Sequence, residues 1–103
     1  MAHTDITNKI KPNLKITEPP MFKVIYMNDN FTTMDFVVRS LVDHFSYTAD
    51  TAESITTGIH EQGSATVAVL PYEIAEQKGI EVTMQARAQQ YPLQIKLEPE
   101  DVA

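Results

Sequence analysis

Three short segments of the sequence have the composition of β-strands, and helix-like patterns fill the stretches between them. FKVIYM at 22–27 and SATVAVL at 64–70 are rich in β-branched and aromatic residues, and LQIKLE at 93–98 alternates apolar with polar residues. A sheet of such short strands needs a second layer to bury its apolar face. The order β-α-α-β-α-β therefore predicts an α+β fold, in which a small antiparallel three-stranded sheet packs against three helices.

The first helix is predicted from a capping pattern and a periodic stripe. Thr32 followed by Asp35 resembles a capping box in which Asp takes the place of Glu. Apolar residues then follow at the i, i+3, i+4, i+7 spacing of a core-facing stripe: Val38, Leu41, Val42 and Phe45. This helix is expected to end at about Phe45.

Capping residues also mark the other two helices. Thr48 can cap a second helix that runs to about Glu61, and Gly63 suits the left-handed residue that ends it. Pro71 occupies a natural first-turn position of the third helix, which is expected to run to about Gln89.

The composition changes at both ends of the chain. Residues 1–20 contain few large apolar side chains and three of the six prolines, which predicts a mobile N-terminal extension. The folded core is expected at 21–98, followed by a short acidic end at 99–103.

Composition and charge exclude several classes of function. The chain has no cysteine, hence no disulfide, no thiolate metal site and no cysteine nucleophile. A formal net charge of −6 and a pI near 4.8 disfavour nucleic-acid binding, which normally uses a basic face. No apolar run approaches the roughly 20 residues that span a bilayer, and the N-terminus lacks the apolar core of a secretory signal. We therefore expect a cytoplasmic, monomeric protein without a membrane or nucleic-acid partner.

The sequence contains no constellation typical of an enzyme. The histidines lack ligand spacing and the carboxylates are scattered, so no metal site is predicted. The serines lack the glycines of a nucleophile elbow, and three glycines are too few for a phosphate loop. The chain is therefore predicted to be a binding module without a cofactor, and not an enzyme.

The strongest candidate site is the stretch MNDNFTTMDF, which starts at Met27. Asn28, Asp29 and His60 all carry hydrogen-bond acceptors, and together they could surround a protonated α-amino group. Met27 and Met34 would then wall an adjoining apolar pocket. The alternative interpretation is a capped turn with two core methionines and an exposed histidine in a last helical turn. Periodicity does not separate the two, because it does not place His60 beside the turn.

This chain resembles the ClpS family, the adaptors of the Clp protease system, in several segments: FKVIYMNDNFTTMDFVVRSLVDHFSYT, IHEQGSATVAV, AEQKG and YPLQIKLE. The family pattern is close to V-N-D-D-[YF]-T-P-M-E-F-V, followed later by V-H-x-x-G. The resemblance covers the whole folded region. It implies an adaptor that recognises N-degrons and delivers substrates to a hexameric AAA+ unfoldase, usually through the N-terminal domain of ClpA, which is paired with the ClpP peptidase.

The resemblance also implies roles for individual residues. Asn28 and His60 would bind the α-amino group of the substrate, and Asp29 would contribute to the same polar end. Glu73 and Lys78 would lie in the surface that docks on the unfoldase, and the N-terminal extension would assist substrate hand-over. Five residues would shape the pocket for a Leu, Phe, Tyr or Trp side chain: Met27, Thr32, Met34, Ile59 and Leu93.

Three positions depart from the family pattern. Asn30 stands where Asp is common, so one negative charge is missing beside the site, and Thr33 replaces the usual Pro in the first helical turn. Thr56 stands where the family often has Met, one of the side chains that close the pocket and disfavour β-branched first residues. Thr56 and Asn30 would therefore give a wider pocket, as in a second-copy adaptor with altered specificity. Alternatively, Ile55 or Ile59 fills the space that the missing Met leaves, and the specificity is that of an ordinary family member. A further alternative is an interaction domain of the same fold that does not read the amino terminus.

Overall fold

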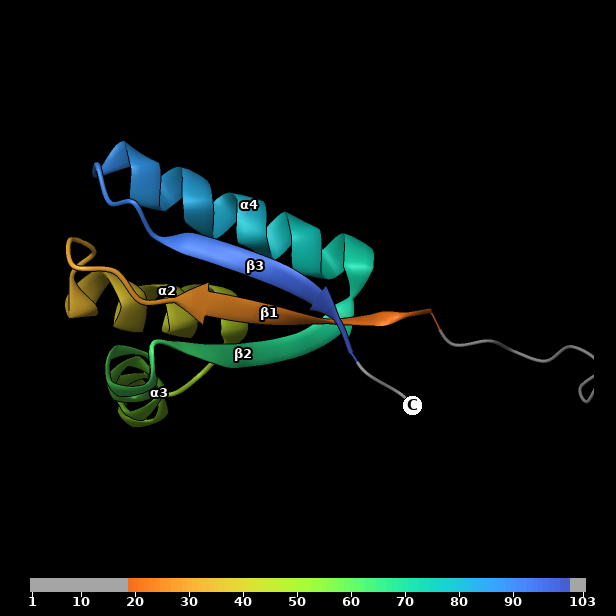
Figure 1. Ribbon diagram of the computed structural model, residues 1–103, viewed down its shortest axis with the longest axis horizontal. Coiled ribbons are helices and arrows are strands. Elements are labelled where there is room, and N and C mark those ends of the chain that lie inside the picture. Colours follow the sequence, from red (N-terminus) through yellow and green to blue (C-terminus); the bar gives the residue numbers. More distant parts are fainter. Residues whose placement is uncertain (1–18, 101–103) are drawn as a thin grey trace, which may run out of the picture.

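The computed structural model describes residues 19–100 and confirms the predicted fold class (Figure 1). The elements follow in the predicted order: β1 Met21–Met27, α2 Met34–Phe45, α3 Ala49–Gln62, β2 Ser64–Pro71, α4 Tyr72–Ala88 and β3 Gln94–Pro99. Residues 1–18 of the predicted N-terminal extension and residues 101–103 of the acidic end lie outside the described residues.

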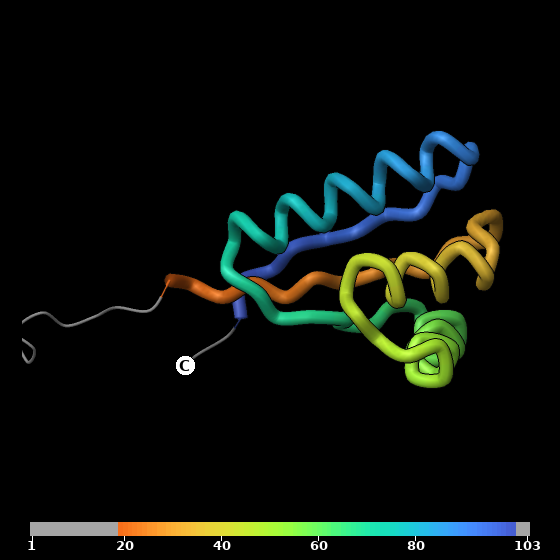
Figure 2. The backbone as a smooth tube through the Cα atoms, turned by 180° about the vertical axis from the view of Figure 1, so that it is seen from behind, coloured from red at the N-terminus to blue at the C-terminus, as the bar shows by residue number. Residues whose placement is uncertain are grey.

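The three strands form one antiparallel sheet in the order β2-β1-β3. β1 occupies the centre, and its Val24 and Tyr26 side chains are fully buried. Figure 2, the view from behind Figure 1, shows α2 and α3 in front of the strands, and α4 runs alongside β3. At the last residue of β1, Met27 pairs with Ser64 on one side and with Gln94 on the other. The end of β1 and the starts of β2 and β3 therefore meet at one end of the sheet.

The predicted cap of the first helix was wrong by one residue. The Thr33 hydroxyl, not that of Thr32, accepts the backbone N–H of Phe36 at 3.2 Å, so Thr33 is the N-cap. The Thr32 hydroxyl instead donates to the Asp29 carboxylate at 2.7 Å. The ClpS pattern usually has proline at this position. Proline has no side-chain acceptor, so it could not make the capping bond that Thr33 makes.

The buried face of α2 is also rotated from the predicted stripe. Leu41 is fully buried as expected, but the other stripe residues are only partly buried, and the buried face includes Val37 and Ser40. Ser40 donates its single hydroxyl proton to the Val37 carbonyl at 2.8 Å. The Tyr26 hydroxyl, which lies 2.8 Å from Ser40 Oγ, is therefore the donor in the bond between these two side chains. Burial raises the pKa of Tyr26 to about 12. A serine belongs to the core here because it has two partners, which hydrophobic periodicity does not detect.

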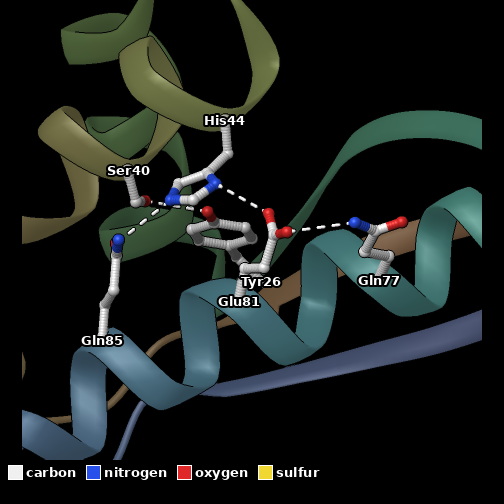
Figure 3. Close-up of polar contacts among 6 residues, drawn as sticks. All are labelled: Tyr26, Ser40, His44, Gln77, Glu81 and Gln85. Atoms are coloured by element: carbon white, nitrogen blue, oxygen red, sulfur yellow. Dashed lines mark hydrogen bonds and ion pairs between the residues drawn. The ribbon is translucent and has the colours of Figure 1, made fainter.

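A polar contact joins α2 to α4 near this buried pair (Figure 3). Nε2 of His44 lies 3.0 Å from Oε1 of Gln85, and Nδ1 of His44 lies 3.5 Å from Oε1 of Glu81. Figure 3 shows the imidazole ring between these two side chains, which extend from successive turns of α4. His44 therefore links two helices and stands apart from the candidate site.

The termini of the other two helices agree with the sequence in most respects. Thr48 caps α3, and Gly63 ends it with a left-handed φ of 94°. Pro71 was expected in the first turn of the third helix, but it is the last residue of β2 and the N-cap of α4, whose first helical residue is Tyr72. Proline is suited to this junction because its fixed φ fits both an extended strand end and the entry to a helix.

Candidate side-chain pocket and amino-binding rim

A cavity of about 190 Å³ lies where the β1–α2 loop faces the second half of α3. This volume is below the roughly 300–1,000 Å³ of typical drug-sized ligand sites, and it suits one amino-acid side chain. Eleven residues line the cavity: Met27, Asn28, Asp29, Asn30, Thr32, Met34, Val37, Thr56, Ile59, His60 and Leu93. We call this cavity the pocket.

A backbone hydrogen bond holds the loop against the end of α3. The Asn28 N–H donates to the Gly63 carbonyl at 2.9 Å, while the Gly63 N–H donates to Ile59 at the same distance. Because Gly63 adopts the left-handed conformation, the chain reverses there and β2 returns beside β1. This geometry brings the Asn28 and His60 side chains, both exposed, to the rim of the same pocket.

Asp29 organises the loop by accepting three hydrogen bonds. Its Oδ1 accepts the backbone N–H groups of Phe31 and Thr32, each at 2.7 Å, and its Oδ2 accepts the Thr32 hydroxyl at 2.7 Å. Burial by itself would raise the pKa of the Asp29 carboxyl, but the bonds from Thr32 and Phe31 and the charge of Arg87 outweigh burial and lower that pKa. A carboxylate has about four lone-pair positions, so one remains for a ligand. The predicted contribution of Asp29 to the polar end is therefore mainly its negative charge.

The loop bonds provide a direct test of this arrangement. Because the folded-state pKa is lowered, the stabilisation from Asp29 is complete above the ordinary value of 3.8 and is lost as the pH falls through the lower folded-state value. We expect the amide proton signals of Phe31 and Thr32, followed by NMR, to shift together with a midpoint below 3.8. A midpoint at or above that value would contradict the three-bond geometry. The Phe36 amide, whose acceptor is the Thr33 hydroxyl, is the control.

The inner wall of the pocket is apolar and well packed. Ile59 is 3% exposed and Leu93 is 1% exposed, and they come from α3 and from the residue just before β3. Thr56 is 3% exposed, and its hydroxyl donates to the Ala52 carbonyl at 2.7 Å within α3. Its single proton is already used, so Thr56 offers no free hydrogen-bond donor to the pocket.

All of the predicted pocket and rim residues line this one cavity. Met34, at the start of α2, is 47% exposed and lies at the mouth. Sequence reasoning missed Val37, which is 6% exposed and follows Met34 by three residues, so the helical spacing of α2 could have identified it. Glu73 and Lys78 lie apart from the pocket on α4, where Lys78 Nζ lies 5.8 Å from the centroid of the Phe45 ring.

Residues 19–100 lack two kinds of feature. This part of the chain brings together no three His, Asp or Glu side chains that could hold a metal ion. It also has no helix with the length and apolar character needed to cross a membrane.

The fold and the pocket define a small α+β domain with an apolar cavity bordered by a rim of hydrogen-bond acceptors. The comparisons with known proteins identify its family. Residues 17–96 match the family model described as ATP-dependent Clp protease adaptor protein ClpS. The chain belongs to the ClpS family.

Individual relatives agree with this assignment over nearly their whole lengths. The chain is 40% identical to the ATP-dependent Clp protease adapter protein ClpS of Acetivibrio thermocellus, over 97% of this chain and 100% of the relative. It is 39% identical to the ClpS protein of Helicobacter hepaticus, over 92% of this chain and 94% of the relative. Among solved structures, ClpS2 of Agrobacterium tumefaciens bound to L-phenylalaninamide matches with a TM-score of 0.78 and 35% identity, covering 81% of this chain and 100% of that one.

Proposed function

We propose that this Clp protease adaptor binds the free α-amino group and the bulky first side chain of N-degron substrates. The first residues expected to bind are Leu, Phe, Tyr and Trp. The observation that carries the proposal is the composition of the pocket, in which Asn28, Asp29 and His60 border an apolar cavity of about 190 Å³. The related ClpS2 structure supports it, because L-phenylalaninamide combines a free α-amino group with an aromatic side chain.

The chemistry of the rim suits an ammonium group. An α-amino group has a pKa near 7.7–8.0, so much of it is protonated and carries three donors at neutral pH. The Asn28 side-chain oxygen and a neutral His60 nitrogen can each accept one of these donors. The ionised Asp29 carboxylate adds attraction without needing to become a full ligand. Hydrogen bonds to charged groups contribute about 1.5–3 kcal/mol each, so the amino group should dominate the affinity.

Delivery to the protease forms the second part of the proposal. Bound substrates pass to a ClpA-type AAA+ unfoldase, which docks on the α4 surface that carries Glu73 and Lys78. The protein acts in the cytoplasm as a monomer without a cofactor, and it catalyses no reaction itself. Glu73 is exposed at the start of α4, and the pocket lies elsewhere on the molecule, so substrate and unfoldase could bind at the same time.

A comparison of two peptides tests the proposal. A fluorescently labelled peptide that starts with Phe should bind with a free amino terminus, and its N-acetylated twin should bind at least about tenfold more weakly, because acetylation removes the charge and two donors. Fluorescence anisotropy titration measures both affinities. Equal binding of the two peptides would favour the alternative of an interaction domain that does not read the amino terminus.

The second candidate function is an adaptor with altered first-residue preference. Thr56 favours it, since a small, buried side chain stands in the pocket wall where the family often has Met. Asn30 also lines the pocket and leaves one charge fewer beside the rim. Both residues would change which N-degrons bind, while the adaptor role would stay the same.

A further inference from the structure

A second hollow adjoins the pocket across the β1–α2 loop. Its volume is about 340 Å³, and residues 27–30 line both this hollow and the pocket. Phe31, Pro92 and Gln94 complete its lining. The pairing of Met27 with Gln94 places the loop and the start of β3 at the same end of the sheet (Figure 1). We call this hollow the Phe31 groove.

Phe31 is held in an exposed position on an ordered loop. Its side chain is 74% exposed, more than any other large apolar side chain of residues 19–100. Its backbone N–H donates to Asp29 Oδ1 at 2.7 Å, and the neighbouring Thr32 N–H donates to the same oxygen. Because the backbone that carries this exposed ring is already fixed, little backbone freedom is lost when the ring binds a ligand. Phe31 is therefore well suited to contact a binding partner.

The path of a bound peptide connects the two hollows. If the first side chain fills the pocket, the second Cα atom lies about 3.8 Å further along the chain. In an extended peptide, successive side chains point to opposite sides. Because residues 27–30 separate the pocket from the Phe31 groove, a peptide crossing this loop would direct its second side chain into the groove.

We propose that the Phe31 groove binds the second residue of the substrate and favours a large apolar or aromatic side chain there. This inference rests on the proposed function. Phe31 supplies an aromatic face and Pro92 an apolar ring, whereas Asp29 and the net charge of −6 disfavour an acidic second residue.

Three peptides that differ only at the second position test the inference. They begin with Phe-Leu, Phe-Ala and Phe-Glu, carry a free amino terminus, and are titrated against the full chain by fluorescence anisotropy. We expect the Phe-Leu peptide to bind about three- to tenfold more tightly than the Phe-Ala peptide, and the Phe-Glu peptide to bind most weakly.

Variants assign this preference to one side chain. Phe31→Ala should reduce the ratio of the Phe-Leu and Phe-Ala affinities to near one, whereas Phe31→Tyr should preserve it because the ring remains. Met84→Ala is the matched control, since Met84 is 66% exposed on α4 and does not line the groove or the pocket. It should leave all three affinities unchanged.

The outcomes distinguish failure of this inference from failure of the proposed function. If the free Phe-Ala peptide binds and its acetylated twin does not, but the second residue has no effect, the groove inference alone is overturned. The same conclusion follows if Phe31→Ala keeps the wild-type ratio. If free and acetylated peptides bind equally, or no peptide binds, both proposals fall.

Discussion

His60→Ala and Asn28→Ala should each lower the affinity for a free peptide starting with Phe by about ten- to a hundredfold. Each substitution removes one acceptor for a charged donor, which is worth about 1.5–3 kcal/mol. Neither should damage the fold. Both side chains are exposed, and the bond that anchors the loop uses the Asn28 backbone N–H, which alanine retains.

His44→Ala is the control for this experiment. His44 is the other histidine of residues 19–100, and it contacts Glu81 and Gln85 on α4 instead of lining the pocket. This change should lower the thermal midpoint slightly and leave peptide affinity unchanged. Anisotropy titrations of the three variants, with circular dichroism to verify folding, give the comparison. If His60→Ala binds the free peptide as tightly as His44→Ala does, the rim does not bind the amino group.

Thr56→Met should change which first residues the pocket accepts. Thr56 is 3% exposed in the pocket wall, and methionine would occupy part of the cavity of about 190 Å³. We expect the affinity for peptides starting with Ile or Val to fall about tenfold relative to Leu, because a branched Cβ needs width close to the rim, and overpacking costs about 1–3 kcal/mol. Affinities for Leu, Phe, Trp, Ile and Val peptides, each measured with both proteins, give the ranking.

Thr56→Val separates pocket volume from polarity. Valine keeps the size and branching of threonine but removes the hydroxyl that bonds to the Ala52 carbonyl. Since that hydroxyl is satisfied within the helix, Thr56→Val should preserve the wild-type ranking. An unchanged ranking in Thr56→Met would mean that Thr56 does not set specificity. Ile59 would then be the neighbour that fills the gap, because it lines the pocket and Ile55 does not.

Two of the errors in the sequence-based predictions arose at polar side chains whose partners the local sequence does not show. Thr32 and Thr33 are equally good caps by residue type, and the choice depends on Asp29, which binds the Thr32 hydroxyl. Ser40 was absent from the predicted core stripe because its buried partner, Tyr26, lies on a strand. Such choices depend on contacts between distant segments, and local patterns carry no information about them.

Local sequence patterns were enough to predict the class of fold and the boundaries of its elements to within a residue or two. Three of these patterns are local effects of backbone geometry: the alternation in the last strand, the Thr48 cap and the Gly63 stop. In the structure, each lies at its predicted position or within one residue of it. The resemblance to the ClpS family added the expected roles of the site residues.

The gathering of these residues around one cavity depends on the tertiary structure. Asn28 and His60 line the same pocket because the Asn28 N–H bonds to the Gly63 carbonyl at the end of α3, and no periodicity of either segment requires that bond. In the same fold the Asp29 carboxylate accepts hydrogen bonds from its own loop, and Phe31 stays exposed beside it. Helix and strand formation depend on neighbours in the chain, whereas a pocket depends on how separate elements pack, and packing is fixed only when the whole core closes.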